Sequence, residues 1–171
     1  MTKLLVLSVL SGLLFSVLGG DAKTLKEGEK APDFVLEDAY GHSYKLSSFR
    51  DKSPVVLYFY PKAGTSGCTK EACGIRDDLS KFKKNNITVL GVSVDSKAAI
   101  KKFIDEYHLN FPLLSDEGKN VSKDYGVLNK LGVDNRITFI IDKKGTINSI
   151  IRNVDVTTHS AQVYSIASKL L

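Results

Sequence analysis

Two cysteines, Cys68 and Cys73, are the residues of this 171-residue chain whose type and spacing best suit covalent chemistry. A thiol reacts as the thiolate, and the start of a helix favours that form because unpaired backbone N–H groups and the helix dipole stabilise an anion. Glu71, in the same predicted turn, opposes the thiolate unless it points outward or is paired with a base. The pair therefore suggests redox chemistry, and two buried thiols that never react are the alternative.

The spacing of the two cysteines limits what bond they can form. In one continuous helix, residues 68 and 73 have Cα atoms about 8.5 Å apart. A disulfide usually needs a Cα separation below about 7 Å. Cys68 and Cys73 would therefore bond only after at least one helical turn unwinds, which indicates a redox cycle with two conformations rather than a static bridge.

A strand, a loop and a helix must position Cys68. Residues 55–60 form an uninterrupted apolar run rich in β-branched and aromatic side chains, which predicts a strand buried on both faces. Pro61 ends this strand, and a loop with two glycines follows at residues 62–67. Beyond Cys68, apolar residues recur at helical spacing, so the cysteine lies at a helix N-terminus; these residues are Ala72, Ile75, Leu79 and Phe82.

The motif around the first cysteine is specific. Pro61, Thr65 and Cys68 have the spacing P-x-x-x-T-x-x-C, and Cys73 follows five residues later. This sequence resembles the active site of a peroxiredoxin, and more narrowly that of the bacterioferritin comigratory protein, or peroxiredoxin Q, group. The resemblance extends from about residue 25 to the C-terminus and includes the segments APDF, GVSVD and RITFIID at residues 31–34, 91–95 and 136–142. The family usually has proline where this chain has Ser66, and the segment between residues 125 and 136 looks shorter than in many relatives.

The resemblance implies a role for each motif residue. Cys68 is the peroxidatic cysteine, Cys73 the resolving cysteine, and Arg136 the active-site arginine, while Pro61 belongs to the same motif. Thr65, Arg136 and the backbone N–H groups near Cys68 would stabilise the charge that spreads over both peroxide oxygens.

The activity expected from the resemblance is thiol-dependent reduction of hydrogen peroxide and organic hydroperoxides. It would form a sulfenic acid and then an intramolecular disulfide, which a thioredoxin-like dithiol reduces. No metal, haem or flavin is needed, so we expect no cofactor.

The order of predicted elements indicates an α/β domain. We expect a β-hairpin around residues 38–42, a strand at 87–94, a helix capped by Ser96 and an extended piece at 111–114. A short helix at 119–125, a hairpin across residues 137–151 and a final helix from Thr157 follow. This alternation is similar to the thioredoxin-like fold, a three-layer α/β/α sandwich with a central mixed sheet and, here, an N-terminal β-hairpin.

The N-terminus differs from the rest of the chain. Lys3 precedes an uncharged run at residues 4–18, followed by Gly-Gly-Asp-Ala. The run is shorter than the roughly 20 residues of a spanning helix but suits a secretory signal. We therefore expect residues 1–22 to be a signal peptide that directs export to a periplasm, the exterior or an organelle lumen, and 23–171 to be one domain. An uncleaved membrane anchor is the main alternative, and a core helix is another.

Charge and the remaining residues restrict the partners. The net charge of +5 comes largely from short, scattered lysine groups, and no basic block with interleaved aromatics points to nucleic acid. We expect a monomer or weak dimer, with no stable membrane insertion once the signal is cleaved. His42, His108 and His159 share no metal-ligand spacing with the cysteines, so we expect no metal site and surface or partly buried histidines.

Two other functions stay open. The first is a protein thiol–disulfide oxidoreductase, against which the absence of Cys-x-x-Cys and the presence of Thr65 argue. The second is an exported non-enzymatic binding domain on the same scaffold, with one disulfide or two inert thiols.

Overall fold

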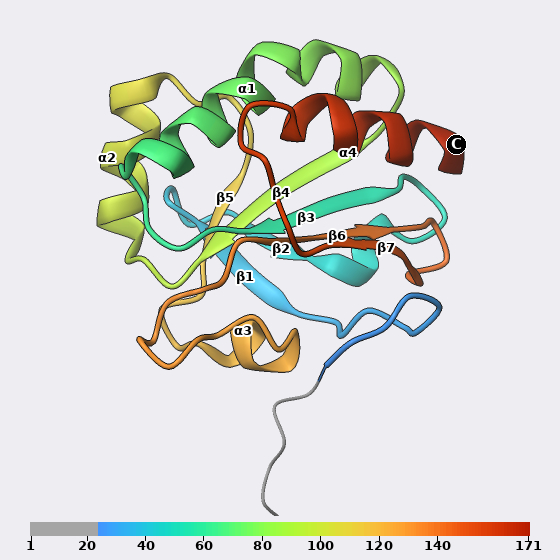
Figure 1. The fold of residues 1–171 in the computed structure, drawn as a ribbon, viewed down its shortest axis with the longest axis horizontal. Coiled ribbons are helices and arrows are strands. Elements are labelled where there is room, and N and C mark those ends of the chain that lie inside the picture. The colour runs from blue at the N-terminus through green and yellow to red at the C-terminus, as the bar shows by residue number, and fades with distance from the viewer. Residues whose placement is uncertain (1–23) are drawn as a thin grey trace, which may run out of the picture.

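A seven-stranded mixed sheet forms the centre of residues 24–171, the part of the chain that the computed structural model describes (Figure 1). The predicted signal peptide at residues 1–22 lies outside the described residues. The strand order is β2-β1-β5-β4-β3-β6-β7, in which β3, β4 and β5 run parallel and the other neighbours pair antiparallel. The strands are β1 (Val35–Asp38), β2 (Ser43–Lys45), β3 (Val55–Phe59), β4 (Thr88–Ser93), β5 (Leu113–Ser115), β6 (Ile137–Ile141) and β7 (Ile147–Ile151).

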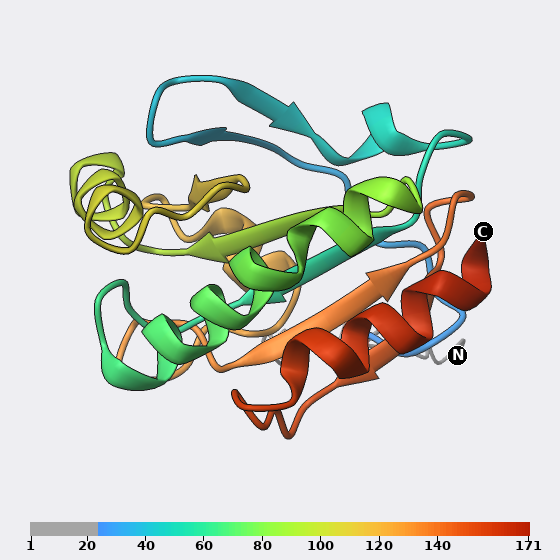
Figure 2. The same cartoon turned by 90° about the horizontal axis from the view of Figure 1, so that it is seen from above.

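Helices cover both faces of this sheet. One face packs against α1 (Ser66–Lys84), α2 (Lys97–Tyr107) and α4 (His159–Ala167), which the short 3₁₀ helix η2 (Ser168–Leu170) follows. The other face packs against α3 (Asn120–Asp124), the 3₁₀ helix η1 (Leu46–Phe49) and the segment that precedes β1. Figure 2 shows α1 and α4 lying side by side across the sheet. The predicted three-layer arrangement is confirmed.

The burial of β3 on both faces of the sheet explains why its sequence is apolar without interruption. All five of its residues are buried. Val56 and Tyr58 point into the core beneath α1, whereas Leu57 and Phe59 point into the core above α3, since side chains alternate along a strand. A strand covered on both faces cannot place a polar residue at either set of positions without burying it.

The predicted elements are present, with some shifts at their ends. Helix α1 begins at Ser66, two residues before Cys68, and Asn85 caps its C-terminus. The hydroxyl of Ser96 accepts a hydrogen bond from the backbone N–H of Ala99, as predicted for the cap of α2. The N-terminal hairpin also extends the main sheet, because β1 pairs with β5. None of the helices within residues 24–171 is long and apolar enough to cross a membrane.

Candidate active site

Cys68 lies in the first turn of α1, directly after the turn that leaves β3. The turn passes through Gly64, whose φ of +76° favours glycine, and Thr65 is the N-cap residue. Cys68 is the third helical residue and only 2% exposed, while Cys73 is half-buried; both are free thiols. The prediction that one continuous helix holds both cysteines is confirmed, and they lie about 140° apart around its axis. The two thiols therefore face different surroundings.

Arg136 reaches the sulfur because of how β6 pairs with β3. Phe59 at the end of β3 lies opposite Ile137 at the start of β6, so Arg136 lies at the sheet edge from which the cysteine loop departs. Its Nη2 donates a hydrogen bond to Cys68 Sγ at 3.2 Å. The guanidinium thus brings positive charge and a hydrogen-bond donor to the sulfur, which stabilises the thiolate.

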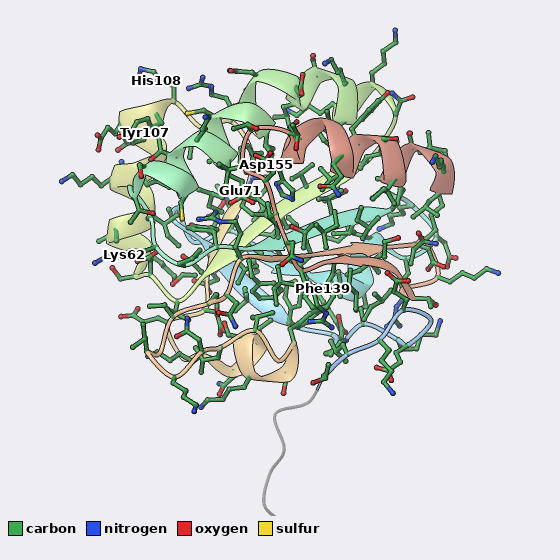
Figure 3. The ribbon with its side chains drawn as sticks, viewed as in Figure 1. Lys62, Glu71, Tyr107, His108, Phe139 and Asp155 are labelled. Atoms are coloured by element: carbon green, nitrogen blue, oxygen red, sulfur yellow. The ribbon has the colours of Figure 1, made fainter. Side chains whose placement is uncertain are left out.

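Glu71 is buried one turn beyond Cys68, between α1 and the sheet (Figure 3). Arg136 Nη1 donates to its Oε2, and His159 Nδ1 lies 3.0 Å from its Oε1. Both carboxylate oxygens therefore have basic neighbours. Pairing with a base is one of the two conditions, stated above, under which Glu71 does not oppose the thiolate. Burial acts to lower the pKa of Arg136, but the Glu71 carboxylate and the Cys68 sulfur outweigh it and raise that pKa. Arg136 therefore keeps its charge.

His159 contradicts the expectation of a surface or partly buried histidine. It is 0% exposed and is the first residue of α4, and its Nε2 hydrogen-bonds the Thr138 hydroxyl at 2.8 Å. His42 and His108 are exposed, as expected. A sequence signal was available, because His159, Val163 and Ala167 are four residues apart in the predicted final helix and share one face, which the structure buries. His159 therefore belongs to the buried face of α4.

Thr65 and Pro61 occupy the loop but do not contact the sulfur through hydrogen bonds in this conformation. The exposed Thr65 hydroxyl donates to the Lys62 carbonyl at 3.0 Å. Pro61 is half-buried where β3 ends. The expected role of the Thr65 hydroxyl at a peroxide oxygen stays a prediction.

The other polar groups do not suggest a metal. Across residues 24–171 no group of three or more His, Cys, Asp or Glu side chains is arranged to hold a metal ion.

Tyr58 and Tyr60 share the core of Cys68, and burial raises the pKa of Tyr58 well above its usual value. Its phenol therefore stays neutral beside the charged groups.

A mixed sheet of this topology, with a cysteine at a helix start held against an arginine, defines a thioredoxin-like thiol protein. The sequence model of the AhpC/TSA family matches residues 28–150. A chloroplastic peroxiredoxin Q of Triticum aestivum is 45% identical over 131 residues, which cover 75% of this chain and 60% of the relative. The one of Sedum lineare is 45% identical over 134 residues, covering 77% and 71% of the two chains.

Solved structures agree with these sequence matches. The crystal structure of peroxidoxin BcpB from Mycobacterium tuberculosis has a TM-score of 0.79 and 33% identity, and the match covers 86% of this chain and 99% of that one. The chain therefore belongs to the AhpC/TSA family, within its group of peroxiredoxin Q and bacterioferritin comigratory proteins, as the resemblance predicted. This chain spans about 60% of the length of the peroxiredoxin Q of Triticum aestivum.

Proposed function

We propose that this protein is a thiol-dependent peroxidase that uses Cys68 as its nucleophile and Cys73 as its resolving thiol. The observation that carries the proposal is the contact between Arg136 Nη2 and Cys68 Sγ at a helix start. A guanidinium there stabilises the thiolate and can then bind the oxygens of a peroxide. A thiol that is buried only as packing needs no charged partner, so this contact favours a reactive Cys68 over the inert-thiol alternative.

The first step oxidises the sulfur by two electrons. The Cys68 thiolate attacks one peroxide oxygen, the O–O bond breaks, and the other oxygen leaves as hydroxide or alkoxide and takes up a proton. Cys68 becomes a sulfenic acid. Arg136 and the backbone N–H groups at the start of α1 stabilise the charge on both oxygens, and the Thr65 hydroxyl joins them once it leaves the Lys62 carbonyl.

The second step forms the disulfide. The Cys73 thiolate attacks Cys68 Sγ, hydroxide leaves and is protonated to water, and an S–S bond forms. The first turns of α1 must unwind, because the Cα atoms at positions 68 and 73 of an intact helix are about 8.5 Å apart. Gly74 lowers the cost of this opening by about 1 kcal/mol relative to Ala. Arg76 Nη1 donates to the Tyr107 carbonyl at 2.6 Å and holds the rest of α1 against α2.

A dithiol must then restore the two thiols by exchange, and we propose a thioredoxin-like protein as its source. We also propose that residues 1–22 direct export and are removed, leaving 23–171 as one domain that is a monomer or weak dimer. Mass spectrometry of the mature protein measures its first residue, and size-exclusion chromatography with light scattering measures its mass. A mature chain that still begins at Met1 would contradict cleavage.

Stopped-flow mixing of the reduced protein with hydrogen peroxide tests the activity. We expect thiol loss within milliseconds to seconds, none at that rate in Cys68→Ser, and a dimedone-trappable sulfenic acid in Cys73→Ser. Turnover by Cys68→Ser would reassign the nucleophile. A Cys73→Ser protein with neither a dimedone adduct nor a mixed disulfide would remove Cys73 from its role. Reduction of protein disulfides without any peroxide reaction would instead indicate a thiol–disulfide oxidoreductase.

A further inference from the structure

An unbroken chain of polar contacts runs from the reactive sulfur to a histidine on another helix. Cys68 Sγ accepts from Arg136, whose other terminal nitrogen donates to Glu71. The second oxygen of Glu71 lies 3.0 Å from His159 Nδ1, and the far side of that ring meets Thr138 at 2.8 Å. Glu71, His159 and Thr138 are all 0–1% exposed. The proposed peroxidase steps use the first two members of this chain and leave His159 without a role.

The partners of His159 fix the direction of its hydrogen bond. His159 Nδ1 lies 3.0 Å from Glu71 Oε1, and neither atom has another hydrogen-bond partner; because a carboxylate only accepts hydrogen bonds, Nδ1 is the atom that must carry hydrogen for this contact to be attractive. The Thr138 hydroxyl can donate to a bare Nε2 or accept from a protonated one. The imidazole can therefore hold Glu71 in either of its charge states.

Glu71 needs this second partner. Its side chain is fully buried and Oε1 has no hydrogen bond, so the imidazole nitrogen 3.0 Å away is the neighbour that offsets the cost of a charged oxygen there. Without His159, Oε1 would have to turn toward Arg136 or toward the sulfur. The first movement would draw the guanidinium away from Cys68, and the second would place a negative charge beside the thiolate. Either movement disfavours the reactive form of the cysteine.

We propose that His159 is a positioning residue for Cys68: its imidazole, with Nδ1 3.0 Å from Oε1, holds the Glu71 carboxylate in place, and Glu71 in turn keeps Arg136 on the sulfur. This inference rests on the proposed function, because it assigns the contact a purpose in thiolate reactivity. His159 itself does not touch the reacting atoms.

Several charged or titratable groups surround His159 and bear on any pH test. Glu71 approaches from α1, and Tyr58 from β3 packs edge-on with ring centroids 6.0 Å apart. Arg136 lies beyond Glu71. Asp78, also on α1, accepts a hydrogen bond from Ser160, the next residue of α4. The test variants leave all of these groups in place, except that the double variant also changes Glu71.

Two polar substitutions separate the contact with Glu71 from the contact with Thr138. His159→Asn places an amide N–H near the position of Nδ1 and keeps a donor toward Glu71. His159→Gln places its amide near Nε2, so it reaches Thr138 and leaves Glu71 Oε1 without a nitrogen beside it. All variants also carry Cys73→Ser, so that Cys68 is the only thiol. The exposed His42→Gln is the matched control, and circular dichroism with thermal unfolding checks the fold of each variant.

Two rates are measured across pH: alkylation of Cys68 by iodoacetamide, which reports the thiolate, and oxidation by hydrogen peroxide. We expect His159→Gln to lower the peroxide rate about 10- to 100-fold, the size of effect that follows when the outer partner of a reactive-site residue is removed. Its alkylation profile should shift to higher pH. His159→Asn should restore most of the rate, and the His42→Gln control should match the parent protein.

A double variant tests whether His159 acts through Glu71. In a Glu71→Gln background, His159→Gln should cost much less than in the parent, because the two residues act as one unit. Equal losses in the Asn and Gln variants, an undiminished loss beside Glu71→Gln, or unchanged rates would each overturn the proposal. If the parent protein fails to react with peroxide but the alkylation pattern appears, the proposed function fails and the positioning role of His159 stands.

Discussion

Asp134, two residues before Arg136, is predicted to make the stability of this protein depend on pH. Its side chain is 0% exposed, and neither carboxylate oxygen has a hydrogen-bond partner. Burial raises the pKa of Asp134 from 3.8 to about 7, and the nearby carboxylates of Asp116 and Asp95 act in the same direction. The folded protein therefore keeps a proton on Asp134 at pH values where the unfolded chain has released it.

The sign and size of the effect follow from this difference. Between pH 4 and 7 the folded state binds more protons than the unfolded state, so stability falls as the pH rises through that range. A shift from 3.8 to about 7, at about 1.4 kcal/mol per pKa unit, corresponds to about 4 kcal/mol of lost stability above pH 7. Roughly one third of this loss is already present at pH 5.

Asp134→Asn removes the ionisable group at nearly constant shape. We expect the free energy of unfolding of this variant, relative to the parent, to rise by up to about 3 kcal/mol between pH 5 and pH 8. Urea denaturation of the reduced proteins at both pH values measures this change. Asp155→Asn is the matched control, because Asp155 is exposed and hydrogen bonds from Thr157 lower its pKa. A pH dependence of Asp134→Asn equal to that of the parent would refute the reasoning.

Three further predictions concern the site and its scaffold. Arg136→Lys should lower the second-order rate constant for peroxide by about 100-fold, since one ammonium cannot replace a guanidinium that bridges two partners; stopped-flow kinetics measures this, and a loss below threefold would contradict it. Ser66→Pro should raise the free energy of unfolding by about 0.4–1 kcal/mol, because residue 66 is the first helical position and Thr65 has the extended ψ of 151° that a following proline requires. A lower thermal midpoint would show that the turn does not accept the ring. Gly91→Ala should destabilise the fold by about 1–3 kcal/mol, because its Cβ would lie 2.5 Å from Leu113 Cδ2; an unchanged urea midpoint would count against the packing argument.

Local patterns were sufficient to predict the elements around Cys68. The apolar run of β3, the glycine-containing turn and the helical spacing after Cys68 each depend on neighbours within a few residues, and all three are present. The separation of the two thiols along one helix followed from helix geometry alone. The Ser96 cap and the hairpin between β6 and β7 were predictable for the same reason.

Contacts between distant segments were not predictable in this way. Arg136 is 68 residues from Cys68 and reaches it only because β6 pairs with β3 in one register. The residues around Arg136 do not by themselves place it at the site, and only the family resemblance pointed there. His159 was misplaced because its burial depends on how α4 packs against α1. The raised pKa of Asp134 likewise depends on the atoms around it, which the sequence does not specify locally.

The sequence by itself determined that this chain carries a cysteine at a helix start, a second thiol that an intact helix keeps out of bonding range, and the family to which both belong. Only the tertiary structure decided which charges surround the sulfur. It brought Arg136, Glu71 and His159 together from a strand edge and two helices. The physical reason is that helices and strands arise from short-range periodicity, whereas the electrostatics of a buried site depend on strand register and helix packing over the whole chain.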